Sequence, residues 1–193
     1  MEIFFISFVV IAAAEMGDKT QLLALLLTSR FRKPVPIILG MFTALSVGHI
    51  IMATVGNLIA KWLQGNLLHW ILGISLFGAA IWAWIPEKVE VDENEVKDVS
   101  HHNIFLSSFV SFTLAELGDK TQIATAALAA QFHSFVWVVL GTTTGMMAVN
   151  VPVILLSHAF GDKLPMKLIK LISGGIFACL GAYEISKVFT GQP

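Results

Sequence analysis

Long apolar runs are the feature of this 193-residue sequence that most restricts its fold. A helix needs roughly 20 apolar residues to cross the ~30 Å hydrocarbon core of a bilayer. Six runs are close to that length or longer: residues 3–28, 35–59, 67–85, 104–130, 135–157 and 168–189. Only 13% of the residues are charged, against about 25% in a typical soluble domain. The sequence therefore predicts an all-α membrane protein with six transmembrane helices. Its few, scattered basic residues predict no nucleic-acid-binding surface.

Two segments of the chain repeat nearly the same sequence 101 positions apart. Residues 7–31 read SFVVIAAAEMGDKTQLLALLLTSRF and residues 108–132 read SFVSFTLAELGDKTQIATAALAAQF, with 12 of 25 positions identical. We therefore divide the chain into a first three-helix repeat (1–85), an acidic linker (86–103) and a second three-helix repeat (104–193). Because each repeat would cross the membrane three times, the second must start from the opposite side. Such inverted repeats are typical of secondary transporters.

The loops of the predicted helices differ in positive charge. One side of the membrane would carry eight basic residues: Arg30, Arg32, Lys33, Lys88, Lys97, Lys163, Lys167 and Lys170. The other side would carry Lys61 and Lys187, apart from the lysines of the repeated motif. Since basic loops stay in the cytoplasm, we expect a cytoplasmic central linker and two non-cytoplasmic termini. We also expect the first run to be a retained helix, because it contains Glu2, lacks Lys and Arg, and recurs inside the chain.

The repeated motif places acidic residues deep within two of the predicted helices. Glu15 lies about 12 residues into the first run, which corresponds to roughly 18 Å, near the middle of a bilayer. Glu15 and Asp18 are three residues apart and would share one helical face. Glu116 and Asp119 repeat this spacing. We expect two inverted helices to bring both pairs together, and a charge at that depth indicates function because it is costly to bury there.

Four converging carboxylates would suit a hard divalent cation such as Ca²⁺, Mg²⁺ or Mn²⁺. Four neighbouring side chains are candidates for further oxygen ligands: Thr20, Gln21, Thr121 and Gln122. Gly17 and Gly118 allow the helix to bend, and a local break would free backbone carbonyls as ligands. The motif contains no Cys or His, which disfavours a structural zinc site.

The charges of the motif suggest how cations and protons would compete. Four carboxylates with Lys19 and Lys120 sum to −2 when all are ionised, and one divalent cation would neutralise them. Protons could neutralise the same carboxylates when the cation leaves. This competition is a sufficient physical basis for exchange across a membrane.

Structural alternatives exist for several of these residues. The carboxylates could pair with the two lysines only to hold helices together, and the two lysines could pair without touching an ion. Gln21 and Gln122 could form hydrogen bonds between helices instead of binding an ion. His49 and Asn150 occupy equivalent positions of the repeat, and we expect them to be buried, hydrogen-bonded side chains. A solvated linker explains the acidic segment 86–103 without a role in collecting cations.

The duplicated E-x-G-D-K-T motif in a six-helix inverted repeat resembles the Gdt family of cation/proton exchangers, over essentially the whole chain. That family includes Golgi manganese and calcium transporters and bacterial manganese exporters, and the short length resembles a bacterial member. The resemblance implies that Glu15, Asp18, Glu116 and Asp119 bind the cation. It also implies that Lys19 and Thr20 complete the first motif, and Lys120 and Thr121 the second. The transport activity that it implies is manganese efflux driven by proton influx.

We therefore predict a secondary transporter of the bacterial inner membrane, not an enzyme, that exchanges Mn²⁺ or Ca²⁺ for protons. The transported cation would be its only inorganic partner, with no other cofactor, and its oligomeric state stays open. One alternative is an intramembrane metal-dependent hydrolase, although the sequence has no H-E-x-x-H motif. Another is a passive channel for divalent cations, which would favour weaker binding at several sites.

Overall fold

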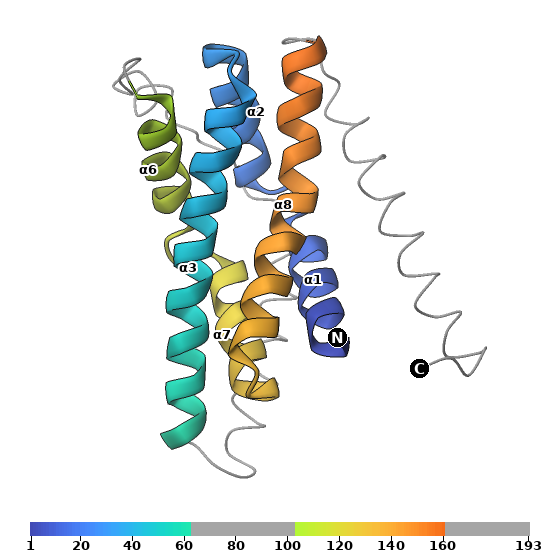
Figure 1. The fold of residues 1–193 in the computed structure, drawn as a ribbon, viewed down its shortest axis with the longest axis vertical. Helices are drawn as coiled ribbons and strands as arrows, with labels where there is room; N and C mark the ends of the chain where they lie inside the picture. The colour runs from blue at the N-terminus through green and yellow to red at the C-terminus, as the bar shows by residue number, and fades with distance from the viewer. Residues whose placement is uncertain (63–102, 161–193) are drawn as a thin grey trace, which may run out of the picture.

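The computed structural model describes residues 1–62 and 103–160, and all regular structure within those ranges is α-helical. The helices, labelled as in Figure 1, are α1 (Glu2–Glu15), α2 (Lys19–Phe31), α3 (Pro34–Trp62), α6 (Ile104–Glu116), α7 (Lys120–Phe132) and α8 (Phe135–Phe160). The expected all-α class is confirmed for this part of the chain. The predicted runs 67–85 and 168–189, and the linker 86–103 apart from Asn103, lie outside the described residues.

A break interrupts each of the two runs that carry the repeated motif. It separates α1 from α2 in the first copy and α6 from α7 in the second. The φ angle is 81° at Gly17 and 75° at Gly118, a left-handed conformation that glycine adopts without the steric cost of a Cβ atom. The runs expected over 3–28 and 104–130 are therefore each divided into two helices, and the bend that the two glycines allow is present in both copies.

Within the described ranges, two uninterrupted helices are long and apolar enough to cross a membrane, as judged from length and composition. They cover Pro34–Trp62 in α3 and Phe135–His158 in α8, and they match the expected runs 35–59 and 135–157. The shorter of the two has 24 residues. At 1.5 Å per residue it extends about 36 Å, more than the ~30 Å of a bilayer core.

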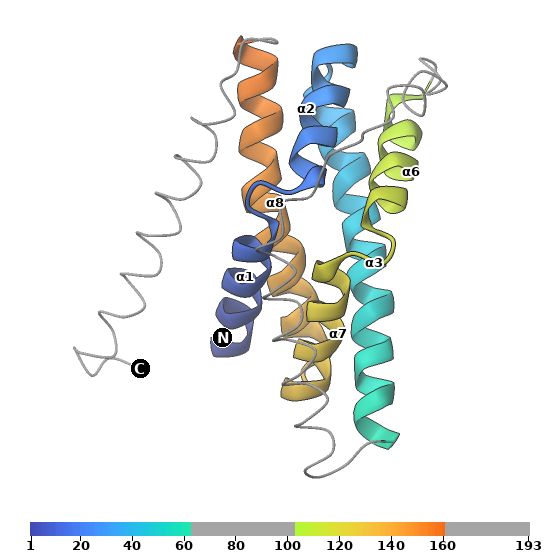
Figure 2. The ribbon, with the colours of Figure 1, turned by 180° about the vertical axis from the view of Figure 1, so that it is seen from behind.

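The described helices form one bundle in which the two copies run in opposite directions (Figure 1). The chain rises along the long axis of the bundle through α1 and α2 and descends through α6 and α7. In the same way α3 descends and α8 rises. Seen from behind, both breaks lie near the middle of the bundle along its long axis (Figure 2).

Each long helix packs closely against the first helix of the other copy. A Cβ atom added to Gly40 of α3 would lie 2.7 Å from both the carbonyl oxygen of Phe105 and the Cβ of Ser108 in α6. A Cβ atom added to Gly141 of α8 would lie 2.5 Å from the carbonyl oxygen of Phe4 and 2.8 Å from the Cβ of Ser7 in α1. These two contacts are equivalent in the repeat. Both glycines therefore allow a close helix approach that no larger residue permits.

We expect Gly56→Ala to destabilise the bundle by about 1–3 kcal/mol, because a Cβ atom there would overlap the carbonyl group of Ala126 in α7. Thermal unfolding in detergent would measure the loss. Gly48→Ala is the matched control on the same helix, since its Cβ would meet only the amide nitrogen of Gln122, at 3.6 Å. Equal melting temperatures for the two variants would contradict the close approach at Gly56.

Candidate functional site

The two helix breaks bring the four motif carboxylates into the interior of the bundle. Glu15 is the last residue of α1 and Glu116 the last residue of α6, while Asp18 and Asp119 directly precede α2 and α7. All four are buried, with at most 5% of their surface exposed. The two residues of each pair thus belong to different helices. The expectation that they share one helical face is wrong, and the break is what directs both side chains inward.

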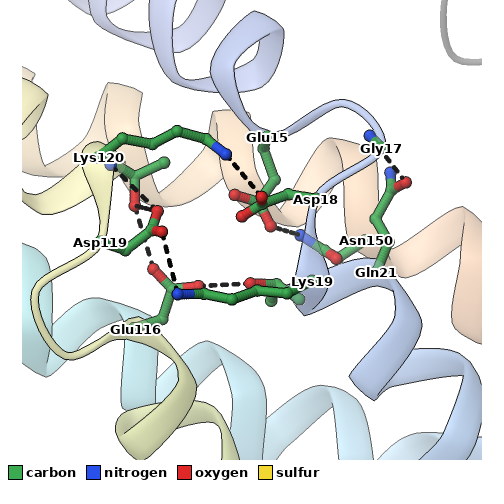
Figure 3. Close-up of polar contacts among 11 residues, drawn as sticks. Glu15, Gly17, Asp18, Lys19, Gln21, Glu116, Asp119, Lys120 and Asn150 are labelled. Atoms are coloured by element: carbon green, nitrogen blue, oxygen red, sulfur yellow. Dashed lines mark hydrogen bonds and ion pairs between the residues drawn. The ribbon is translucent and has the colours of Figure 1, made fainter. Parts of the chain in front are cut away.

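Three of these carboxylates form a compact cluster (Figure 3). One oxygen from each of Glu15, Asp18 and Asp119 lies within 4.8 Å of the other two. Oxygen ligands lie 2.3–2.6 Å from Ca²⁺ and about 2.0–2.1 Å from the smaller Mg²⁺. Two ligands of one ion can therefore be roughly 4–5 Å apart. The cluster has the spacing and the hard oxygen chemistry that a divalent cation requires.

Glu116 lies beside this cluster and is engaged by two hydroxyl groups. Thr20 donates to Oε1 of Glu116 at 2.6 Å, and Thr121 donates to Oε2 at 3.0 Å. The hydroxyl of Thr121 also lies 3.0 Å from Oδ2 of Asp119. Both threonines that the sequence singled out are therefore at the site, where they connect Glu116 to the opposite copy and to the cluster.

The two motif lysines pair with aspartates of the opposite copy. Lys120 lies 2.5 Å from Oδ1 of Asp18, and Lys19 lies 3.2 Å from Oδ1 of Asp119. These pairs are equivalent in the repeat but differ in exposure: the side chain of Lys120 is 6% exposed and that of Lys19 is 32% exposed. With four carboxylates and two lysines ionised, the site carries a charge of −2.

The motif glutamines stabilise the helix breaks. The backbone N–H of Gly17 donates to the side-chain oxygen of Gln21 at 3.1 Å, and the N–H of Gly118 donates to that of Gln122 at 3.4 Å. In this conformation each glutamine oxygen thus accepts a hydrogen bond from the break itself. Direct binding of an ion by either glutamine stays a prediction.

Asn150 of α8 contributes to the site although it lies outside the motif. Its side-chain nitrogen donates to Oε1 of Glu15 at 3.3 Å (Figure 3). The equivalent residue of the first copy, His49, instead contacts the hydroxyl of Thr143 at 3.0 Å through Nδ1. The sequence signal for Asn150 is a polar residue at the position of the repeat that His49 occupies in the first copy. That signal indicates a hydrogen bond but not its partner.

Comparisons with known proteins agree with this chemistry. The family described as "Divalent cation/proton antiporter GDT1" matches residues 3–90 and 104–191. A Vibrio cholerae protein described as "Putative manganese exporter" is 44% identical over 178 residues, covering 92% of this chain and 87% of the relative. GDT1-like protein 3 of Oryza sativa is 26% identical, covering 96% of this chain and 73% of the relative. GDT1-like protein 5 of Arabidopsis thaliana is 24% identical over 89% and 90%, respectively. No solved structure matches the chain significantly.

Proposed function

Because the chain belongs to the GDT1 family of divalent cation/proton antiporters, we propose that it exports Mn²⁺ in exchange for protons. The observation that carries the proposal is the buried cluster of Glu15, Asp18 and Asp119, which has one oxygen of each residue within 4.8 Å of the others. A carboxylate cluster of this kind in a membrane protein marks an ion pathway or binding site by default, because burying charge there is costly.

Mn²⁺ is the first candidate for the substrate and Ca²⁺ the second. Both accept carboxylate oxygens, and the site has no thiol or imidazole among the clustered ligands. The relative with 44% identity is described as "Putative manganese exporter", which favours Mn²⁺. Both ions accept six oxygen ligands, so the carboxylates of the cluster are compatible with either ion.

The charge of the site supports exchange with protons. A divalent cation would neutralise the net charge of −2, and protons bound to the same carboxylates would neutralise it after the cation leaves. The two species therefore compete for one site. We expect the affinity for Mn²⁺ to fall as the pH is lowered, because protons then occupy more of the ligand oxygens.

We further propose that the chain forms two inverted three-helix repeats in the bacterial inner membrane, with the linker in the cytoplasm and both termini outside. The opposite directions of α1–α2 and α6–α7 (Figure 1) and the equivalent cross-copy contacts of Gly40 and Gly141 support this arrangement. The distribution of Lys and Arg supports the orientation. Discontinuous helices that meet in mid-membrane are a common way to build a transporter site.

Flux measurements in proteoliposomes would test the proposed exchange. An imposed proton gradient should drive Mn²⁺ uphill against its own gradient in wild-type vesicles, and Mn²⁺ transport should move protons in the opposite direction. Asp119→Asn is the control, because it removes one clustered carboxylate and should abolish both fluxes. Mn²⁺ flux that only dissipates its own gradient would contradict exchange and indicate a channel. Parallel assays with Ca²⁺, Mg²⁺ and Zn²⁺ would identify the substrate.

A further inference from the structure

Asn150 reaches the carboxylate cluster from α8, a helix that carries none of the repeated motif. It is completely buried. Its side-chain nitrogen lies 3.3 Å from Oε1 of Glu15 and 3.0 Å from the backbone carbonyl oxygen of Met146, one helical turn earlier. A carbonyl oxygen accepts hydrogen bonds but cannot donate one, and the same is true of an ionised carboxylate. Both partners therefore require the NH₂ group of the amide, which fixes the orientation of the side chain.

The two oxygens of the Glu15 carboxylate differ in their hydrogen bonding. Oε1 accepts the hydrogen bond from Asn150, whereas Oε2 is buried and has no hydrogen-bond partner among the described residues. Glu116 differs, because Thr20 and Thr121 donate to its two oxygens. Glu15 thus has a restrained orientation together with an oxygen that is available to an ion, and it belongs to the compact cluster while Glu116 does not.

We infer that Asn150 is a positioning residue for cation binding, which anchors Glu15 to α8 and keeps its carboxylate beside those of Asp18 and Asp119. This inference rests on the proposed function. The hydrogen bond to Met146 holds the amide against its own helix, and the second hydrogen bond transmits that restraint to Glu15. Partners that orient a metal ligand in this way typically affect metal affinity by about 10–100-fold.

The equivalent position of the first copy provides an internal comparison. His49 is also buried, but its Nδ1 contacts Thr143 of α8 instead of a carboxylate. The two copies are therefore not interchangeable at this position: the amide acts on Glu15, whereas the imidazole joins α3 to α8. A variant of His49 tests whether the loss of any buried polar side chain has the same effect.

Isothermal titration of the purified full chain with Mn²⁺ would test the role of Asn150. We expect Asn150→Leu, which is similar in size but cannot donate, to weaken binding about tenfold or more. Asn150→His retains an N–H donor and should stay within about threefold of wild type, while His49→Leu should also stay within that limit. In flux assays, Asn150→Leu should raise the KM for Mn²⁺ and leave the maximal rate largely unchanged.

Two outcomes would overturn the inference. One is a folded Asn150→Leu protein that binds Mn²⁺ within threefold of wild type, and the other is an equal loss of affinity in Asn150→His. If thermal unfolding shows that the leucine variant does not fold, Asn150→Ala takes its place under the same criteria. Glu15→Gln, measured alongside, separates the two proposals. Normal Mn²⁺ binding by Glu15→Gln would refute the proposed site itself. If Glu15→Gln loses Mn²⁺ binding while Asn150→Leu binds Mn²⁺ normally, only the role of Asn150 is refuted.

Discussion

Replacing Glu15 with glutamine is expected to abolish Mn²⁺ binding and transport while leaving a folded protein. Glutamine has nearly the same shape as glutamate and can still accept the hydrogen bond from Asn150, so the packing of α1 is preserved. The substitution removes one negative charge from a cluster of three buried carboxylates. Removing one partner of a buried charge interaction costs about 3–5 kcal/mol, which corresponds to a loss of affinity of at least about a hundredfold.

Titration calorimetry and proteoliposome flux would measure this loss, and thermal unfolding in the absence of metal would show that the variant is folded. Glu2→Gln is the matched control, because Glu2 lies in the first turn of the same helix and is exposed. It removes the same charge far from the cluster and should behave as wild type. Mn²⁺ transport at the wild-type rate by Glu15→Gln would contradict the proposed site.

Replacing Lys120 with methionine is expected to destabilise the metal-free protein more than any other single change at the site. Lys120 and Asp18 are both buried and lie 2.5 Å apart. Methionine preserves the length and most of the apolar packing of the side chain but removes its charge, which leaves the carboxylate of Asp18 buried without this cation. Breaking such a pair typically costs about 3–5 kcal/mol of the free energy of unfolding.

Lys19→Met is the control for this experiment, since Lys19 forms the equivalent pair with Asp119 but has a partly exposed side chain. We expect a smaller loss than in Lys120→Met, because solvent reaches the partly exposed Lys19 and screens its interaction with the buried Asp119. Thermal unfolding of both variants without metal would compare them. Added Mn²⁺ should recover part of the loss in Lys120→Met, because the ion supplies positive charge to the same carboxylates. Equal destabilisation by the two substitutions would contradict the difference in burial.

The two lysine pairs suggest how the site would tolerate the absence of the proposed ion. Each lysine lies against an aspartate of the other copy, so positive charge stays beside the carboxylates when no cation is bound. Each pair also connects the first copy directly to the second, next to the two helix breaks. An ion pair that holds helices together is therefore compatible with a role of the same lysines in transport.

Much of the candidate site could be identified from the sequence, because a duplicated acidic motif inside apolar runs is rare and its cost in a bilayer is high. Glu15, Asp18, Asp119 and Glu116 were all candidates on that basis. The members of each pair nevertheless do not share a helical face, because glycine at the centre of each motif adopts a left-handed conformation and ends the helix.

Other features of the site could not be derived from local sequence. Nothing in the repeat distinguishes Glu116, which two threonines engage, from Glu15, which has a buried oxygen without a partner in the described part of the chain. The contact between Asn150 and Glu15 joins residues 135 positions apart. Such differences depend on how α8 packs against α1, and the pattern of apolar residues within either helix does not specify that packing.

The sequence by itself determined the all-helical class, the duplication and the identity of the acidic residues, because helix length, periodicity and the cost of buried charge depend on local composition. Only the tertiary structure decided which carboxylates cluster, which lysine pairs with which aspartate, and which neighbouring side chain holds Glu15. These choices depend on the distances between helices from opposite halves of the chain. Those distances are set by close contacts at residues such as Gly40 and Gly141, where the absence of a side chain lets two backbones approach.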